Sequence, residues 1–128
     1  MMIMKRIFKT KAFERWLKKS TLKNESLCAA IHEMETGLFE ADLGAGLYKK
    51  RIAGSGQGKR SGSRTLIASN LNSRWFFVFG FAKSQRANIN QRETEALKKL
   101  THDLLELTEP QIKHALANHL LLEICHDQ

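Results

Sequence analysis

The sequence predicts a small α+β fold with two N-terminal helices, a central antiparallel sheet and C-terminal helices. Apolar residues at helical spacing come first, strand-like segments rich in β-branched and aromatic residues occupy the middle, and helical spacing returns after Asn90. Helices and strands that are segregated along a chain are typical of α+β proteins. A chain of 128 residues with 42% apolar content is long enough for one domain, residues 1–128, around a single hydrophobic core.

The N-terminal part of the chain predicts a short strand followed by two helices. Apolar and basic residues alternate up to Phe8, which indicates a strand. Residues 10–19 place their large apolar side chains at helical spacing. A second helix is expected to begin near Asn24 and to end at Gly37, because glycine often terminates helices. Residues 38–46 contain glycines and acidic residues, and we expect them to form a loop.

The middle of the chain predicts three strands. Residues 47–53, 64–70 and 74–82 are rich in β-branched and aromatic side chains. The last of these segments is the most aromatic and is expected to be the central strand. Residues 70–73 form a polar turn that would join it to the preceding strand as a hairpin. The glycine-rich residues 54–63 predict an irregular loop between the first two strands.

The C-terminal part predicts two further helices and a short final segment. Asn90 and Glu93 have the spacing of a capping box, so a helix is expected to start there. Pro110 suits the first residue of another helix, which would end near Asn118. Residues 120–125 fit either a strand or a continued helix, and we favour the strand.

Cysteine usage and hydropathy indicate the cellular compartment of the protein. The chain has two cysteines, Cys28 and Cys125, which lie far apart and form no disulfide framework for a chain of this size. We expect both to be reduced and to lie in or near the core. No apolar run approaches the roughly 20 residues that cross a bilayer, and there is no secretory segment. These observations predict a cytoplasmic protein with no membrane contact.

Positive charge is concentrated in the middle of the chain. Residues 43–92 carry ten Lys and Arg residues and no Asp or Glu. Residues 1–42 carry eight basic and six acidic residues, and residues 93–128 carry three basic and seven acidic residues. Clustered cations repel one another, and a polyphosphate partner relieves this repulsion and releases counterions. The pattern indicates nucleic-acid binding, with a solvated basic surface as the alternative.

Strand geometry divides three consecutive cations between the two faces of the predicted sheet. Side chains alternate along a strand, so Lys49 and Arg51 point to one face and Lys50 to the other. Arg64 and Lys83 come from neighbouring predicted strands. We expect Arg64 and Lys83 together to line one concave basic groove.

The glycine-rich loop suits the close approach of an RNA or DNA backbone beside Lys59 and Arg60. It lacks the spacing of a Walker A loop and of a dinucleotide fingerprint. The alternative is a flexible hairpin loop with solubilising charges. The five histidines lie outside the basic segment and show no metal-ligand spacing. We therefore expect no metal and no cofactor.

Such a set of cations has the means to cleave RNA without a metal. The 2′-hydroxyl attacks the adjacent phosphate, so the site must align it, remove its proton and stabilise the added negative charge. Lys and Arg stabilise that charge, and each preorganised donor of this kind contributes about 3–4 kcal/mol. Neighbouring cations favour the neutral form of a lysine, which brings it closer to use as a base. Tyr48, the only tyrosine, either contacts RNA by stacking or proton donation or lies in the core.

Four segments carry a resemblance to a known family. They are residues 33–44 (EMETGLFEADLG), 49–52 (KKRI), 56–64 (GQGKRSGSR) and 79–89 (FGFAKSQRANI). In this order they resemble the RelE/HigB-like toxins of bacterial type II toxin–antitoxin systems, over about residues 27–107. The resemblance implies a small α+β RelE-like fold with an antiparallel sheet and a basic cleft.

The resemblance also implies an activity, partners and site residues. It implies a metal-independent mRNA interferase that cuts mRNA in the ribosomal A site, inhibits translation and is silenced by a cognate antitoxin, which we expect to be of the helix-turn-helix type. The residues expected to carry catalysis and phosphate contacts are Lys49, Arg51, Lys59, Arg64 and Lys83, and those expected to bind RNA are Lys50, Arg60, Arg86 and Tyr48. The alternatives are a non-catalytic nucleic-acid-binding protein and a gyrase-inhibiting toxin homologue on the same fold.

Overall fold

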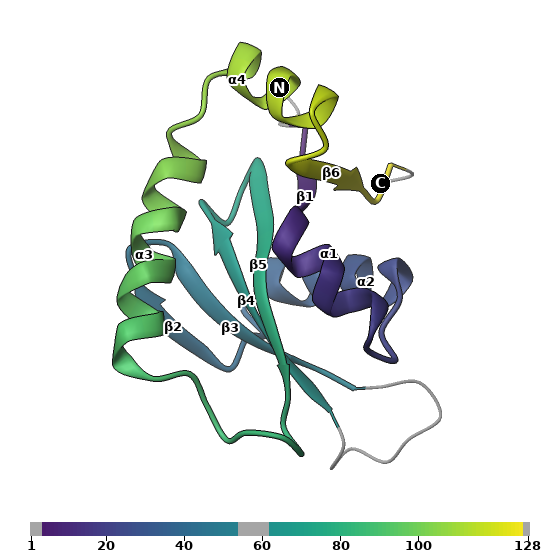
Figure 1. Cartoon of the computed structure of the whole chain (residues 1–128), viewed down its shortest axis with the longest axis vertical. Coiled ribbons are helices and arrows are strands. Elements are labelled where there is room, and N and C mark those ends of the chain that lie inside the picture. The colour runs from purple at the N-terminus through teal and green to yellow at the C-terminus, as the bar shows by residue number, and fades with distance from the viewer. Residues whose placement is uncertain (1–3, 54–61, 127–128) are drawn as a thin grey trace.

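The computed structural model describes residues 4–53 and 62–126, which form an α+β fold built on one sheet (Figure 1). The strands are β1 (Arg6–Thr10), β2 (Ala41–Gly44), β3 (Leu47–Ile52), β4 (Ser63–Ser69), β5 (Arg74–Ala82) and β6 (Leu121–Ile124). The helices are α1 (Lys11–Lys18), α2 (Asn24–Glu35), α3 (Gln91–Leu105) and α4 (Glu109–Ala117). Within these ranges no helix has the length and apolar character of a membrane span.

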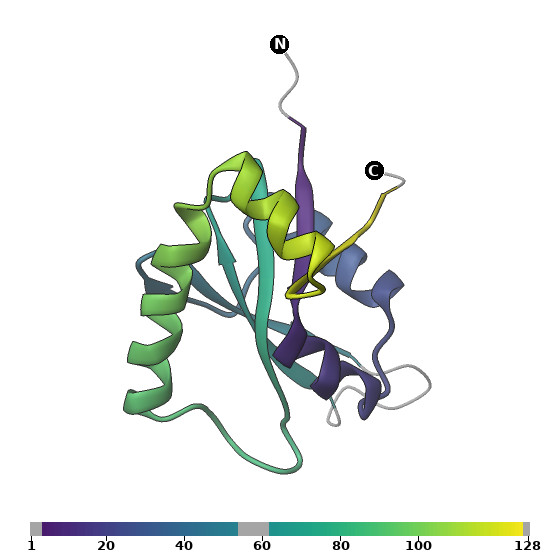
Figure 2. The same ribbon diagram turned by 45° about the horizontal axis from the view of Figure 1, so that its top comes forward.

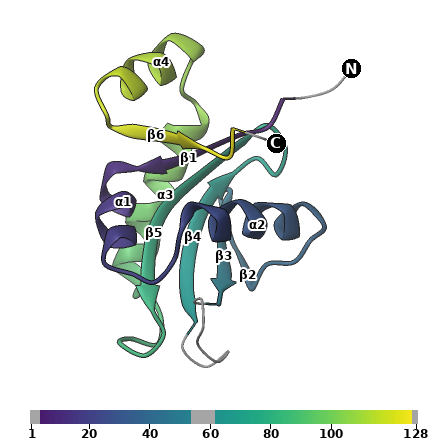
Figure 3. The same ribbon diagram turned by 90° about the vertical axis from the view of Figure 1, so that its right-hand side faces the viewer.

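The sheet has six strands in the order β2-β3-β4-β5-β1-β6. All neighbouring pairs are antiparallel except β1 and β5, which run parallel. Helices α1 and α2 cover one face and α3 covers the other, as Figure 3 shows. Figure 2 shows α4 beside β6 at the C-terminal edge of the sheet. The predicted fold class is therefore confirmed, with one parallel pair that the sequence pattern did not predict.

Each face of the sheet has its own hydrophobic core. Because side chains alternate along a strand, the fully buried neighbours Phe76 and Phe77 enter opposite cores. Phe77 packs against Phe13 of α1 with tilted rings, whose centroids are 5.3 Å apart. Phe76 stacks on Phe8 of β1 at 5.0 Å. The aromatic run of β5 thus holds helices on both sides, as expected of a central strand.

Gly80 allows α1 to approach β5 closely. A Cβ atom at this position would collide with the ring of Trp16. The indole ring therefore occupies the space that any other residue would need, and glycine is required here for packing rather than for a special backbone conformation.

The helix starts expected from the sequence are confirmed by their caps. The Asn90 side chain accepts a hydrogen bond from Glu93 N at 2.8 Å, and the Glu93 carboxylate accepts one from Asn90 N at 2.9 Å. Thr108 and Gln111 form a second capping box at the start of α4, with Pro110 in the first turn. Each box satisfies backbone donors that a helix N-terminus leaves without intrahelical partners.

Two segments were open or wrong in the sequence prediction. Residues 121–124 form strand β6, antiparallel to β1, which confirms the favoured alternative for this segment. The predicted loop 38–46 instead contains strand β2, which pairs with β3 at the sheet edge. β2 is short and contains Asp42 and Gly44, so no apolar alternation marks it, and the backbone of β3 alone makes it a strand.

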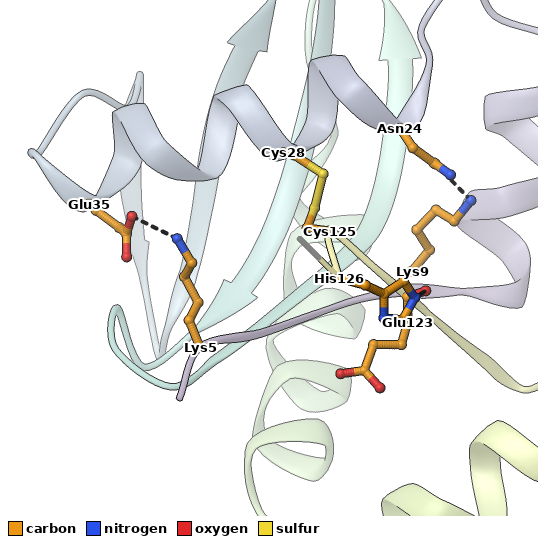
Figure 4. The surroundings of a disulfide bond; sticks show 8 residues. All are labelled: Lys5, Lys9, Asn24, Cys28, Glu35, Glu123, Cys125 and His126. Atoms are coloured by element: carbon orange, nitrogen blue, oxygen red, sulfur yellow. Dashed lines mark hydrogen bonds and ion pairs between the residues drawn. A yellow bond between two sulfur atoms is a disulfide. The ribbon is translucent and has the colours of Figure 1, made fainter. Parts of the chain in front are cut away.

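The expectation of two reduced cysteines is wrong. Cys28 of α2 and Cys125 after β6 form a disulfide with an S–S distance of 1.98 Å and a Cα–Cα distance of 5.7 Å (Figure 4). The expected near-core position holds, since both residues are partly buried and Cys125 packs against the core under α2. The two cysteines are 97 residues apart in sequence, so only the folded chain brings them together. In a chain-entropy description, a cross-link of such length stabilises the fold by about 4–5 kcal/mol.

An arginine network fixes the C-terminal segment to the sheet. Arg6 of β1 donates two hydrogen bonds to the Glu123 carboxylate, at 2.9 and 3.0 Å, and a third to Glu109 at 2.9 Å. Arg74 of β5 also donates to Glu109, at 2.9 Å, and to Leu107 O at 2.5 Å. The hydrogen bonds from Arg6 lower the pKa of Glu123, and those to Glu123 raise the pKa of Arg6. This network anchors β6 and the start of α4.

We expect Glu123→Gln to lower the free energy of unfolding at neutral pH by about 1–2 kcal/mol, because it removes the charge-assisted pair with Arg6. That corresponds to a fall in Tm of roughly 4–10 °C. The lowered folded-state pKa means that the ionised Glu123 contributes stability above its ordinary value of 4.5. The contribution is lost as pH falls through the folded-state pKa, so the two proteins should converge in acid. Thermal unfolding followed by circular dichroism across this range measures the difference.

Glu106→Gln is the matched control, because Glu106 is exposed and its carboxylate lies 3.8 Å from the equally exposed imidazole of His102. It should leave Tm within about 1–2 °C of the wild type. An equal loss of Tm in both variants would contradict the role given to Glu123.

Candidate nucleic-acid interface

The register of three strands gathers cations on one face of the sheet. Arg51 of β3 lies opposite Arg64 of β4, and Arg64 lies opposite Phe81 of β5. Lys49 precedes Arg51 by two residues and therefore points to the same face. Phe81 belongs to the core under α3, so these cations share the α3 side of the sheet.

A carboxylate that the sequence analysis did not select lies among these cations. Arg64 Nε donates to both oxygens of Glu40, at 2.8 and 3.1 Å, and Lys49 Nζ lies 3.9 Å from the same carboxylate. Glu40 directly precedes β2, and its N–H donates to Lys49 O at 2.7 Å. The pairing of β2 with β3, which the sequence did not predict, therefore positions the side chain of Glu40. The one sequence signal for Glu40 was its place in the segment 33–44 that carries the family resemblance.

Electrostatics explains why an anion is favoured here. Like charges directly opposite each other on neighbouring strands destabilise a sheet, and Arg51 and Arg64 are such a pair. Arg64 and Lys49 retain only 11% and 16% exposure of their side chains, whereas Glu40 retains 36%. The carboxylate therefore lies outermost and offsets the repulsion of the cations beneath it. A phosphate group has the charge and acceptor oxygens to replace it.

The connection between β5 and α3 adds polar groups beside this face. Lys49 Nζ donates to Asn88 Oδ1 at 3.3 Å, which ties the strand to the connection. Within the connection, Lys83 Nζ donates to Ala87 O at 3.1 Å, and Arg86 donates to Asn88 O at 3.0 and 3.1 Å. Lys83 itself is exposed at the end of β5. These bonds hold the connection in a defined conformation next to Lys49.

Arg86 covers the aromatic end of β5. Its guanidinium lies over the rings of Phe79 and Phe81, 6.0 and 5.5 Å from their centroids. It also donates to both oxygens of Glu93, at 3.1 and 2.5 Å. These hydrogen bonds lower the pKa of Glu93 and raise that of Arg86. Arg86 thereby links the start of α3 to β5, and its stacked guanidinium plane extends the cationic surface.

Two predicted RNA-binding residues lie on the opposite face. The expected division of Lys49 and Arg51 from Lys50 is confirmed, because Lys50 is buried with its Nζ 2.7 Å from Glu33 of α2. Tyr48 is also buried under α2, and its ring packs edge-on against Phe39 with centroids 4.9 Å apart. Burial raises the pKa of the Tyr48 hydroxyl. The nearby Asp42 raises it further. The core position considered for Tyr48 is the one observed.

The structure thus divides the predicted site residues into three groups. We call Lys49, Arg51, Arg64 and Arg86 the basic face, with Lys83 at its edge. Lys50 and Tyr48 lie on the other side of the sheet and do not join it. Lys59 and Arg60 fall outside the described residues, so their position relative to the basic face stays a prediction.

The fold and the basic face define a class, a small basic α+β protein suited to a polyanionic partner. Comparison with protein families makes this specific. The model of the family described as the RelE toxin of the RelE/RelB toxin–antitoxin system matches residues 5–124. The chain belongs to this family, which confirms the resemblance carried by its four segments. Among curated proteins, none is similar enough to count as a match.

We expect Glu40→Gln to bind single-stranded nucleic acid more tightly, because a phosphate then no longer competes with a carboxylate for Arg64 and Lys49. The Kd for a short 2′-O-methyl RNA, which cannot be cleaved by attack of its 2′-oxygen, should fall roughly threefold to tenfold. Fluorescence anisotropy at several salt concentrations measures this change.

Glu25→Gln is the matched control, since Glu25 is an exposed residue of α2 and loses the same charge on the other side of the sheet. It should change Kd by less than about twofold. Equal gains in affinity for the two variants would show that only net charge matters and that Glu40 has no special place in the interface.

Proposed function

We propose that this RelE-family toxin is a ribosome-dependent endoribonuclease that inhibits translation by cutting mRNA at its basic face. The observation that carries the proposal is that Arg64, which lies opposite Arg51, binds the carboxylate of Glu40 through its guanidinium. A sheet that places cations face to face gains stability from an anion, and an RNA backbone supplies one at every nucleotide. Family membership supports the same function, because the family's members are toxins.

The proposed reaction is attack of a ribose 2′-oxygen on the adjacent phosphorus. The new P–O2′ bond forms as the P–O5′ bond breaks, which leaves a 2′,3′-cyclic phosphate and a 5′-hydroxyl. Arg64 and Lys49 would donate to the non-bridging phosphate oxygens, where negative charge grows in the transition state. Charge-assisted N–H···O bonds of this kind are stronger than neutral ones.

We assign proton removal from the 2′-hydroxyl to the Glu40 carboxylate. It is the carboxylate in contact with Arg64, and its exposure lets it face an incoming ribose once a phosphate displaces it from the guanidinium. A carboxylate held by Arg64 would thus become available when substrate binds. The departing 5′-oxygen would take its proton from a lysine ammonium of this region, such as Lys83, or from water.

The partners follow from the same charges. The RNA strand that reaches the basic face would be an mRNA undergoing translation on the ribosome. With this substrate the toxin would act in the cytoplasm. A cognate antitoxin, which we propose to be of the helix-turn-helix type, would silence it by covering the basic face with acidic side chains or by preventing ribosome entry. Complementary charge favours both the rate and the specificity of such an association.

We expect Arg64→Ala to abolish growth arrest on induction in a bacterial host and to lower the cleavage rate at least ~100-fold, because it removes a donor to the developing charge. Primer extension on mRNA from translating ribosomes measures the new 5′ ends. Arg15→Ala is the control, since Arg15 is exposed on α1 across the sheet. Circular dichroism verifies that both variants fold. A folded, fully toxic Arg64→Ala protein would overturn the assignment.

Glu40→Gln separates the proposed base from the phosphate-binding cations. It should lower kcat by roughly 100-fold or more while KM stays constant or falls, because binding improves as proton removal is lost. Lys49→Ala should instead raise KM and lower kcat, since Lys49 would contact the phosphate in both states. A Glu40→Gln protein with unchanged kcat would remove Glu40 from the chemistry.

The same assays distinguish the alternatives from an endoribonuclease. Ribosome binding without new mRNA ends would indicate a non-catalytic nucleic-acid-binding protein. Inhibition of gyrase-catalysed supercoiling by the purified chain, with translation unaffected, would indicate a gyrase-inhibiting toxin on this fold.

A further inference from the structure

The disulfide lies on the side of the sheet away from the basic face. It joins Cys28 of α2 to Cys125, which directly follows β6 (Figure 4). β6 is an edge strand that is paired only with β1 in the sheet order. The bond therefore ties the C-terminal edge of the sheet to a helix that packs over β3. It is independent of the residues to which we assign RNA cleavage.

We propose that Cys28 and Cys125 are a reversible thiol–disulfide switch, in which oxidation locks β6 onto α2 and reduction leaves that edge free to open. Two properties of the surroundings support reversibility. The two elements are held next to each other by contacts other than the bond, and both cysteines are only partly buried.

Both elements have anchors of their own. β6 pairs with β1 along its whole length, buries Leu121 and Ile124, and is held by the two hydrogen bonds from Arg6 to Glu123. α2 is held by a buried apolar stripe that includes Leu27 and Ile31. Reduction would therefore leave the two thiols close together, so that the bond can re-form without a large rearrangement.

The pair lies at the margin of the core. Both cysteines are only partly buried, unlike the fully buried apolar residues of the neighbouring core. Figure 4 shows Lys5, Lys9, Glu35 and Glu123 in the surroundings of the disulfide, and Lys5 is paired with Glu35 at 3.0 Å. The thiolate of either cysteine is the form that reacts in disulfide exchange.

The oxidant we propose is a small-molecule disulfide of the glutathione class. A thiolate of the pair attacks one of its sulfur atoms, forms a mixed disulfide and expels one small thiol. The other cysteine thiolate then attacks the protein sulfur, closes the Cys28–Cys125 bond and expels the second small thiol. The protein pair gives up two electrons and two protons, and the small disulfide takes up both to become two thiols.

Reduction would change the edge strand rather than the basic face. Short edge elements open locally at low cost, and β6 has four residues. Cys125 also has a φ of 64°, a left-handed conformation that is unfavourable for a residue with a Cβ. In the oxidised chain the cross-link opposes relaxation of this turn. In the reduced chain β6 is retained by strand pairing, by the burial of Leu121 and Ile124 and by the Arg6–Glu123 bonds, without the cross-link.

The test uses the full chain equilibrated in glutathione buffers that range from fully reduced to fully oxidised. Thiol alkylation and mass spectrometry measure the fraction oxidised, and limited chymotrypsin digestion measures cleavage within residues 120–125. We expect one reversible transition between two thiols and one disulfide, and cleavage at least ~10-fold faster in the reduced state. RNA plays no part in this test, so its outcome is separate from that of the proposed function.

Cys28→Ser and Cys125→Ser provide the controls. Each should be cleaved at the rate of the reduced wild type in every buffer, and neither should respond to the glutathione ratio. A wild-type pair that stays oxidised throughout would be a permanent structural bond and would overturn the switch. Two free thiols throughout, or a transition with no change in cleavage of residues 120–125, would overturn it as well.

Discussion

The pairing of β3 with β4 places Arg51 opposite Arg64, and the surroundings of the basic face compensate for that repulsion. Glu40 lies over Arg64, Asn88 accepts from Lys49, and the connection after β5 is held against the same strand ends. Each contact lowers the cost of placing cations side by side on a sheet. A group that displaces Glu40 from Arg64 would therefore have to supply negative charge in its place.

Several cations of the middle segment also hold the fold together, and one of them, Arg86, belongs to the basic face as well. Arg74 binds Glu109 and Leu107 O, Lys50 is buried against Glu33, and Arg86 is shared with Glu93. The acidic residues that neutralise these cations come from the flanking segments, outside the basic run. The charge asymmetry of the sequence is therefore partly neutralised by folding, while Lys49, Arg51 and Arg64 share one face of the sheet.

Local features of the fold were predictable because their causes are local. The capping pair Asn90 and Glu93 marks the start of α3, and the polar turn 70–73 marks the hairpin between β4 and β5. Strand β2 was not predicted because its own residues show no strand pattern. Its conformation depends on backbone pairing with β3. The parallel pairing of β1 with β5 was not predicted either, because it depends on which strand lies next to β1 in the folded sheet.

The sequence by itself determined the α+β class, the family and the separation of Lys49 and Arg51 from Lys50, because side-chain alternation and segment order are properties of neighbouring residues. The tertiary structure alone decided that Glu40 belongs to the basic face and that Cys28 meets Cys125. Contacts of this kind join residues 24 and 97 positions apart in the chain. They exist only after the sheet has set its register, so no local pattern encodes them.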